Sequence, residues 1–243
     1  MPVFGRYNHF QVTIMDSMYE ILMGLPLFHG VSYDKISEVV GSTKFHFLKY
    51  LDGQQVVGAG EPCTHIKFII SGSARMTIVN SDGRFKVSQT LTCPDVIAPD
   101  FLFGPATSYP CTVTSINSTG ILQISKPDYV KILNSDPVFL FNFLNTLSMN
   151  AQKAIDGVLA LTTGSLEERI AFWIVALTQR GGRDICLTCR QRDLYALFGV
   201  QRMSFLSTLE KMKSEGLIDY DHNEIHIHSR ADMLRILTSQ SEG

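Results

Sequence analysis

The chain has 243 residues, of which 45 % are hydrophobic and 18 % are charged, and its formal net charge at pH 7 is −2. It is long enough to bury a full core divided between two modest domains. The small net charge excludes a global basic field for nucleic acid, so any such site must be local. Five scattered cysteines argue against a secreted disulfide framework, and no apolar run approaches the roughly 18 residues that span a bilayer. We therefore expect a cytoplasmic protein without an export signal or a membrane anchor.

Two short helical patterns, at residues 18–22 and 36–40, precede a change of period from helix to strand. Between Lys44 and Ser125 the sequence alternates short β-prone runs with turn residues such as Asp52-Gly53. The predicted strands include residues 45–48, 65–70, 74–79, 85–88, 112–115 and 121–124. Regular short strands of this kind favour an antiparallel jelly-roll or barrel over a parallel sheet, and such a roll can hold a small ligand.

The next stretch, residues 136–161, has the apolar spacing of a two-stranded coiled-coil seam, with alternating steps of four and three residues. Asp136 suits the cap of this helix, and Pro137 suits its first turn. The seam consists of Leu140, Leu144, Leu147, Ala151, Ala154, Val158 and Leu161. We interpret it as a dimerisation helix of roughly 37 Å. The alternative is a helix buried inside one globular domain.

A second domain is expected after a joint at residues 162–164. Ser165 and Glu168 have the spacing of a reciprocal capping box. The helix that they begin is predicted to end at the glycines 181–182. The predicted domains are residues 1–135, a roll with N-terminal helices; 136–161, the dimerisation helix; and 162–243, a C-terminal domain.

The predicted C-terminal domain contains two amphipathic helices separated by a turn at Gly199, which is the helix-turn-helix pattern of DNA-binding domains. In that motif the second helix enters the major groove of DNA. From Arg180 to Lys213, seven basic and three acidic residues give a local net charge of +4. The predicted DNA-binding residues are Arg190, Gln201, Arg202, Ser204, Ser207, Thr208 and Lys211. The alternative is a pair of ordinary amphipathic helices with solvated charges, although the strand pair at 216–220 and 224–228 favours a β-wing.

Several short motifs occur in the order and spacing that the Crp/Fnr family of bacterial transcription regulators shows. They are Leu25-Pro26-Leu27-Phe28-His29-Gly30, Gly60-Glu61-Pro62, Phe68-Ile69-Ile70-Ser71-Gly72, Asp82-Gly83-Arg84, Gly199-Val200 with Arg202, and Glu215-Gly216-Leu217-Ile218. Each motif is weak alone, but together they are specific, and the chain resembles this family over residues 20–238.

This resemblance implies an α+β fold. It comprises an N-terminal antiparallel β-roll like a cyclic-nucleotide-binding domain, a long dimerisation helix and a C-terminal winged helix-turn-helix. It also implies a homodimer without enzymatic activity that binds a near-palindromic site on double-stranded DNA. RNA polymerase is a further expected partner.

The sequence departs from those family members that bind cyclic AMP. Where they place a Gly-Glu pair on the ribose and an Arg-Ser pair on the phosphate, this chain has Ala98-Pro99 and Tyr109-Pro110. No guanidinium is left to neutralise a phosphate, and the two prolines remove backbone donors. We therefore expect an unidentified small-molecule effector other than cyclic AMP. The candidate effector pocket consists of Ala98, Pro99, Asp100, Tyr109, Pro110 and Cys111.

In the recognition helix, the family's usual Ser, Glu and Arg at three base-reading positions match Gln201, Met203 and Ser207. Arg202 is retained, and Arg on guanine is the commonest specific contact with DNA. The operator is therefore expected to differ from the family's best-known half-site while retaining one G·C preference.

No metal and no resident cofactor are predicted. Cys186-Leu-Thr-Cys189 is a lone CxxC, whereas a structural zinc normally has four ligands. A redox or metal role for this pair is an open alternative. Haem binding is another, with ligands drawn from His46, Cys63, His65, Met76 and Cys93. His226 and His228 share a strand face on the predicted wing, where contact with phosphate is favoured over a metal.

Two competing functions belong to other classes. A cupin-like metalloenzyme needs a cluster of His and carboxylate ligands inside the roll, and the roll offers only His46 and His65, far apart in the sequence. The other competing function is that of a regulatory roll that binds a protein partner and uses the C-terminal domain only for docking.

Overall fold

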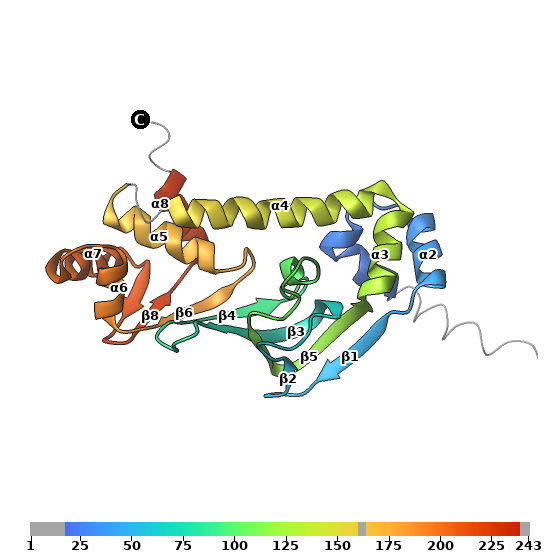
Figure 1. Cartoon of the computed structure of the whole chain (residues 1–243), viewed down its shortest axis with the longest axis horizontal. Helices are drawn as coiled ribbons and strands as arrows, with labels where there is room; N and C mark the ends of the chain where they lie inside the picture. Colours follow the sequence, from blue (N-terminus) through green and yellow to red (C-terminus); the bar gives the residue numbers. More distant parts are fainter. Residues whose placement is uncertain (1–17, 160–163, 239–243) are drawn as a thin grey trace, which may run out of the picture.

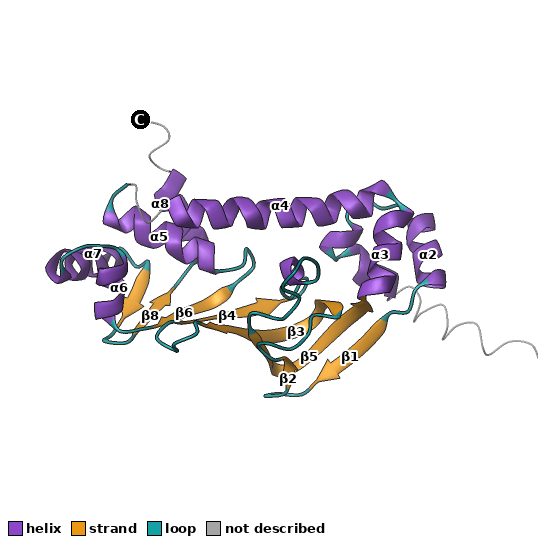
Figure 2. Cartoon of the chain, in the orientation of Figure 1, coloured by secondary structure: helices purple, strands orange, loops and turns teal. Residues whose placement is uncertain are grey.

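The computed structural model describes residues 18–159 and 164–238, within which eight strands form one antiparallel sheet (Figure 1 and Figure 2). The strand order is β1-β5-β3-β4-β6-β8-β7, and β2 pairs with β5 off this path. The strands are β1 His46–Tyr50, β2 Gln55–Val57, β3 His65–Val79, β4 Lys86–Thr92, β5 Thr112–Ser125, β6 Arg183–Thr188, β7 Ile218–Tyr220 and β8 Glu224–Ile227. The helices are η1 Pro26–Phe28, α2 Tyr33–Ser42, η2 Pro99–Phe101, α3 Lys126–Ser135, α4 Pro137–Leu159, α5 Leu166–Leu177, α6 Gln191–Leu197, α7 Arg202–Ser214 and α8 Arg230–Thr238.

The two central strands of the roll are longer than predicted. Residues 65–70 and 74–79 form the single strand β3, and the predicted strands 112–115 and 121–124 form the single strand β5. Gly72 explains the first difference, because its φ of +74° and its close approach to the Ser118 carbonyl let β3 bulge while both halves stay paired with β5. The turn signal in the sequence therefore marks a bulge and not a strand end.

Helix α4 is fixed to the roll at its N-terminal half by aromatic packing. The ring of Phe139 meets Phe28 edge-on at 5.4 Å between centroids, and Phe143 meets Tyr129 in the same way at 5.4 Å. The Asn142 side-chain amide adds hydrogen bonds of 2.9 Å to the carbonyls of Leu27 and His29. These contacts bury the face of α4 that carries Phe139 and Phe143 and leave another face uncovered.

Strand β6, which the sequence analysis did not predict, joins the C-terminal part of the sheet to β4 of the roll. Val87 of β4 is buried in the C-terminal hydrophobic cluster, and the ring of Phe85 meets Trp173 of α5 edge-on at 6.2 Å. The sheet in Figure 1 therefore runs without a break from the roll to the wing. The predicted division into domains at residues 135 and 162 stays a prediction. Strand β4 contributes residues both to the hydrophobic cluster of the roll and to the C-terminal hydrophobic cluster.

The boundaries of two helices differ slightly from those expected. The helix predicted at 136–161 is observed as α4, and residues 160–163, which include Leu161 and most of the predicted joint, lie outside the described residues. Ser165 and Glu168 form the predicted capping box. Helix α5 ends at Leu177 and not at the glycines 181–182, because Thr178 already has extended backbone angles. Among the residues described, no helix has the length and apolar character that crossing a membrane requires.

Candidate DNA-binding surface and effector cavity

Helices α6 and α7 form a helix-turn-helix around a tightly packed apolar centre. Gly199, between them, has a φ of +64°, which L side chains adopt only with strain, so glycine permits the turn. Phe205 and Leu209 of α7 are fully buried, and Phe205 stacks on Phe198 at 6.4 Å. Burial of this face of α7 fixes which of its side chains point to solvent.

The first turn of α7 presents an exposed polar surface. Gln201 precedes the helix as its N-cap, and Arg202, Ser204 and Ser207 follow on exposed positions. Met203 is 74 % exposed in the same turn. The sequence analysis matched Met203 to a base-reading position of the family without including it among the predicted DNA-binding residues, and its exposed apolar side chain suits contact with a thymine methyl group.

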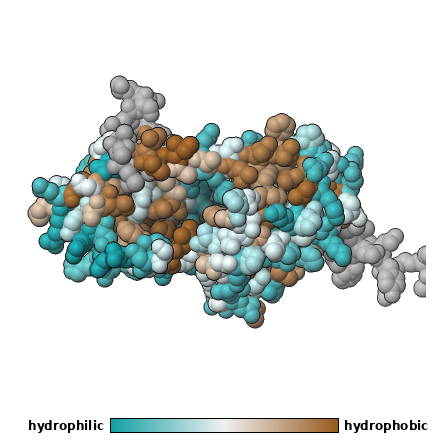
Figure 3. All heavy atoms as spheres, in the orientation of Figure 1, coloured by the Kyte–Doolittle hydropathy of each residue, from teal (hydrophilic) through white to brown (hydrophobic). Residues whose placement is uncertain are grey.

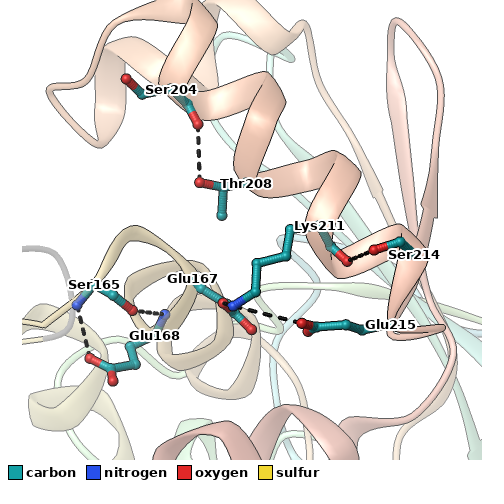
Figure 4. Close-up of polar contacts among 8 residues, drawn as sticks. All are labelled: Ser165, Glu167, Glu168, Ser204, Thr208, Lys211, Ser214 and Glu215. Atoms are coloured by element: carbon teal, nitrogen blue, oxygen red, sulfur yellow. Dashed lines mark hydrogen bonds and ion pairs between the residues drawn. The ribbon is translucent and has the colours of Figure 1, made fainter.

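The other predicted DNA-binding residues are held by partners within the protein. The ammonium of Lys211 pairs with Glu167 of α5 and lies 3.7 Å from Glu215, and Figure 4 shows it pointing back toward α5. The Thr208 hydroxyl donates to the Ser204 carbonyl at 3.0 Å. Arg190 donates to Asp193 at 2.8 Å. Lys211 therefore adds an exposed ion pair to the apolar packing of α7 on α5 in this structure.

The wing contains an ion pair between His228 and Asp219 that raises the pKa of the histidine. Nε2 of His228 lies 2.9 Å from the Asp219 carboxylate, and its Nδ1 donates to the Gly216 carbonyl at 2.8 Å. These two hydrogen bonds hold the pKa of His228 above its usual value, with Asp219 as the larger cause.

A cavity of about 670 Å³ lies where the roll, α4 and the turn between α5 and β6 meet. Its lining is mainly apolar, and Met76, Ile78 and Met149 contribute to it. The Asn150 amide donates to the Asp100 carboxylate at 2.8 Å, and the Lys153 ammonium donates to the Thr178 carbonyl. Burial lowers the pKa of Lys153 to about 8. The cavity thus has an apolar body with an amide, an amine and a carboxylate along the α4 side.

Four of the six predicted effector-pocket residues line this cavity, namely Ala98, Pro99, Asp100 and Pro110. Tyr109 and Cys111 lie in the core of the roll instead, where the Tyr109 hydroxyl donates to the His65 carbonyl at 3.0 Å. The sequence analysis missed Lys153, Asn150 and the α5–β6 turn. The only usable signal in the sequence was the spacing of residues 150 and 153, because helix residues that are three apart lie on the same face of α4.

The residues considered as haem ligands lie in different surroundings. Met76 lines the cavity, where its sulfur accepts hydrogen bonds from Gln89 and Gln179 at 3.7 and 3.6 Å. Cys63 is buried in the core of the roll, whereas His46 and Cys93 are exposed.

Comparison with protein-family models decides the family. The model described as a cyclic nucleotide-binding domain matches residues 47–136, and the model described as a Crp-like helix-turn-helix domain matches residues 168–236. Together the two matches occupy well over half of the chain in the order found in regulators of this kind. The chain belongs to the Crp/Fnr family of transcription regulators. The predicted α+β class, with its roll and C-terminal helix-turn-helix, is thereby confirmed.

A solved structure with a TM-score above 0.5 supports the fold, and a second is similar over more of the chain but with a lower score. The sensor domain of the transcriptional regulator DNR from Pseudomonas aeruginosa is 19 % identical, with a TM-score of 0.51 over 63 % of this chain and 97 % of that one. The catabolite activator protein of Thermus thermophilus is 17 % identical, with a TM-score of 0.49 over 88 % and 99 % of the two chains. At such identities a likeness speaks for the fold alone. No curated protein matches the sequence.

Within this Crp/Fnr fold, α4 exposes a row of large apolar side chains. Leu140 and Leu144 are 41 and 45 % exposed, and Val158 is 68 % exposed. Ala151 and Ala154 are exposed between them, whereas Leu147 is partly covered by the core of the roll. Phe141 and Ile155, which the predicted seam does not include, are 63 and 60 % exposed beside it. Figure 3 shows apolar surface over parts of the molecular edge along which α4 runs.

Proposed function

We propose that this Crp/Fnr protein is a homodimeric, sequence-specific DNA-binding regulator controlled by a small molecule other than cyclic AMP. The observation that carries the proposal is the exposed first turn of α7. There Gln201, Arg202 and Ser204 are free of the apolar centre that buries the opposite face of the helix. Donors at the start of a recognition helix are the groups that read base edges in the major groove.

Arg202 is the residue most suited to specific reading. Its guanidinium can donate two hydrogen bonds to the O6 and N7 acceptors of guanine, a contact that contributes about 1–3 kcal/mol of discrimination. Met203 beside it offers an apolar contact for a thymine methyl group. Lys211, by contrast, is paired with Glu167, so its role in the proposal is to orient α7 on α5.

Dimerisation through α4 is supported by the uncovered apolar row. Exposed Leu, Phe, Ile and Val side chains on one long helix are stabilised by burial, at roughly 25 cal/mol for each Å² removed from water. A helix of 23 residues is roughly 34 Å long. Two copies joined along it by a two-fold axis present two α7 helices to one DNA duplex, which predicts a near-palindromic site with half-sites about 34 Å apart.

The cavity supports a small effector with an apolar body and one polar group. The apolar body would contact Met76, Ile78 and Met149, and the polar group would contact Asn150 or Lys153. Pro99 and Pro110 line the cavity, and by the family resemblance they correspond to ribose- and phosphate-binding residues of relatives that use cyclic AMP. We expect no binding of cyclic AMP by titration calorimetry.

A binding selection from random double-stranded DNA tests the DNA proposal. We expect enrichment of a near-palindromic site, and we expect Arg202→Ala to lose one G·C preference in each half-site. Lys49→Ala, on an exposed position of β1 at the far end of the sheet, removes the same charge and should leave the selected sequence unchanged. Identical selected sequences for Arg202→Ala and the unmodified protein would contradict the assignment.

Sedimentation velocity tests the dimer proposal. Leu144→Glu should yield monomers that no longer bind the palindromic site, because two buried carboxylates would face each other across the α4 seam. Leu51→Glu is the matched control, since Leu51 is 58 % exposed at the end of the roll and away from α4. A dimeric Leu144→Glu variant, or a monomeric unmodified protein, would refute dimerisation through α4.

A further inference from the structure

Strands β6 and β8 bring three metal-ligating side chains together on one face of the sheet. Cys186 of β6 lies directly opposite His226 of β8 in the antiparallel register. Glu224 lies two residues before His226, and therefore on the same face of the strand. One ligand atom of each residue lies within 4.8 Å of the other two. A strand pair holds these three positions more rigidly than a loop would.

We propose that Cys186, Glu224 and His226 form a binding site for a divalent transition metal of the zinc type. The distance from Cys186 Sγ to His226 Nε2 is 4.0 Å, and that from His226 Nε2 to the Glu224 carboxylate is 3.2 Å. In a tetrahedral zinc site with bonds of about 2.0 to 2.3 Å, neighbouring ligand atoms lie about 3.3 to 3.8 Å apart. Small side-chain rotations therefore suffice for all three atoms to contact one ion, with the fourth position open to water.

The donor set selects the class of metal. A thiolate and an imidazole favour Zn²⁺ and similar ions over Mg²⁺ and Ca²⁺, which prefer oxygen. On binding, the Cys186 thiol releases its proton to solvent and its sulfur bonds to the ion, so no oxidant or reductant is needed. The Thr188 hydroxyl, 3.4 Å from Glu224 Oε1, donates to that carboxylate and helps to orient it.

The neighbouring candidates for metal binding are engaged elsewhere. Cys189, the other cysteine of the CxxC, is buried in the C-terminal hydrophobic cluster, and His228 is paired with Asp219. The CxxC pattern in the sequence therefore included one ligand, Cys186, but its partners are about 40 residues away on β8. Strand pairing, which sequence spacing does not reveal, is what brings the site together.

The position of the site predicts its effect on the protein. Cys186 lies on the strand that pairs with β4 of the roll on one side and with β8 of the wing on the other. A bound ion would link β6 to β8 by a second means besides their hydrogen bonds. It binds the folded state only, so it should raise the temperature of unfolding in a concentration-dependent way.

Titration of chelator-treated full-length protein with Co²⁺ tests the proposal, because a cobalt–thiolate bond gives a charge-transfer absorption band. We expect one Co²⁺ per chain, the thiolate band, its loss on addition of Zn²⁺, and a higher unfolding temperature with either ion. Cys186→Ser should abolish the band. His226→Ala should weaken Zn²⁺ binding by more than the roughly 10- to 100-fold that loss of an outer hydrogen-bond partner costs.

Two matched variants serve as controls. Cys93→Ser replaces an exposed cysteine of the roll, and His228→Asn replaces the next histidine on the same strand face; both should keep the band and the affinity. Absence of a thiolate band in the unmodified protein, or its persistence in Cys186→Ser with circular dichroism unchanged, would overturn the proposal. None of these readouts requires DNA, so the outcome is independent of the DNA-binding proposal.

Discussion

The junction between the roll and the C-terminal part depends on the fit of Gln89 against Gly182. Gln89 of β4 is 1 % exposed, and its Oε1 accepts a hydrogen bond of 2.8 Å from the backbone amide of Gln179. A Cβ added at Gly182 would overlap that oxygen and lie 3.1 Å from the Gln179 carbonyl. Gly182→Ala must therefore displace the Gln89 side chain.

The cost of Gly182→Ala has two parts. Overpacking of a buried site costs about 1–3 kcal/mol, and a buried amide left without its acceptor costs about 1–3 kcal/mol. Together the two parts should lower the free energy of unfolding by about 2–6 kcal/mol. Gln89→Ala removes the acceptor and the overlap together, so its cost is that of the hydrogen bonds of Gln89 and of the cavity that its buried side chain leaves. On that background, Gly182→Ala should cost almost nothing further.

Urea denaturation of the four proteins in this double-mutant cycle measures these differences. Trp173 is the only tryptophan in the sequence, and its edge-on contact with Phe85 makes its fluorescence sensitive to the junction itself. Gly41→Ala is the control, because a Cβ there meets nothing within 4 Å. It should stabilise α2 by about 0.5–1 kcal/mol. If Gly182→Ala were neutral, or if its cost added fully to that of Gln89→Ala, the packing described at the junction would be wrong.

Three further predictions concern single side chains. The pKa of His228, measured by proton NMR, should exceed 6.5 and should fall in Asp219→Asn. The stability contributed by this pair should be present below pH 6.5 and lost as pH rises through the raised pKa. The pKa of Lys153 in the folded protein is about 8, below the usual 10.5. Between these two pH values the unfolded chain binds more protons than the folded one, so the free energy of unfolding should rise with pH. Urea denaturation of Lys153→Met should show no such rise. Phe205→Ala should lower the free energy of unfolding by about 3–5 kcal/mol, because the ring is fully buried, whereas Met203→Ala, at an exposed position, should leave stability unchanged and alter only DNA binding.

Local patterns in the sequence were sufficient to predict most of the helices and most of the strands, but helix α8 was not predicted. The capping box at Ser165 and the turn at Gly199 depend on residues close in sequence, and both occur as predicted. Strand β6 was missed because residues 183–188 contain charged and polar residues and alternate only weakly. Its place in the sheet is stabilised by pairing with β4 and β8, which are distant in sequence.

The same limit applies to the candidate sites. The sequence indicated Ala98 and Pro110 as pocket residues by their correspondence to the family's ligand-binding positions, and both line the cavity. Lys153 was not selected, because its proximity to the cavity depends on how α4 crosses the roll and on Thr178 at the end of α5. Lys211 was selected as an outward cation, yet Glu167 of α5 attracts it inward. Charge pairing between elements is visible only once those elements are packed together.

The cavity and the junction share residues, so the effector that we propose would act directly on the contacts between the roll and the C-terminal part. Gln89 and Gln179 line the cavity and also join β4 to the turn after α5. In this proposal, a ligand that contacts Gln89 or Gln179 would change the contacts that position α5. Helix α5 in turn holds α7 through the pair of Glu167 with Lys211. A ligand shifts an equilibrium only by its differential affinity for two arrangements of the protein. Substitutions at Gln89 should therefore have a small effect on DNA affinity without the effector. They should have a larger effect on the change in DNA affinity that the effector causes.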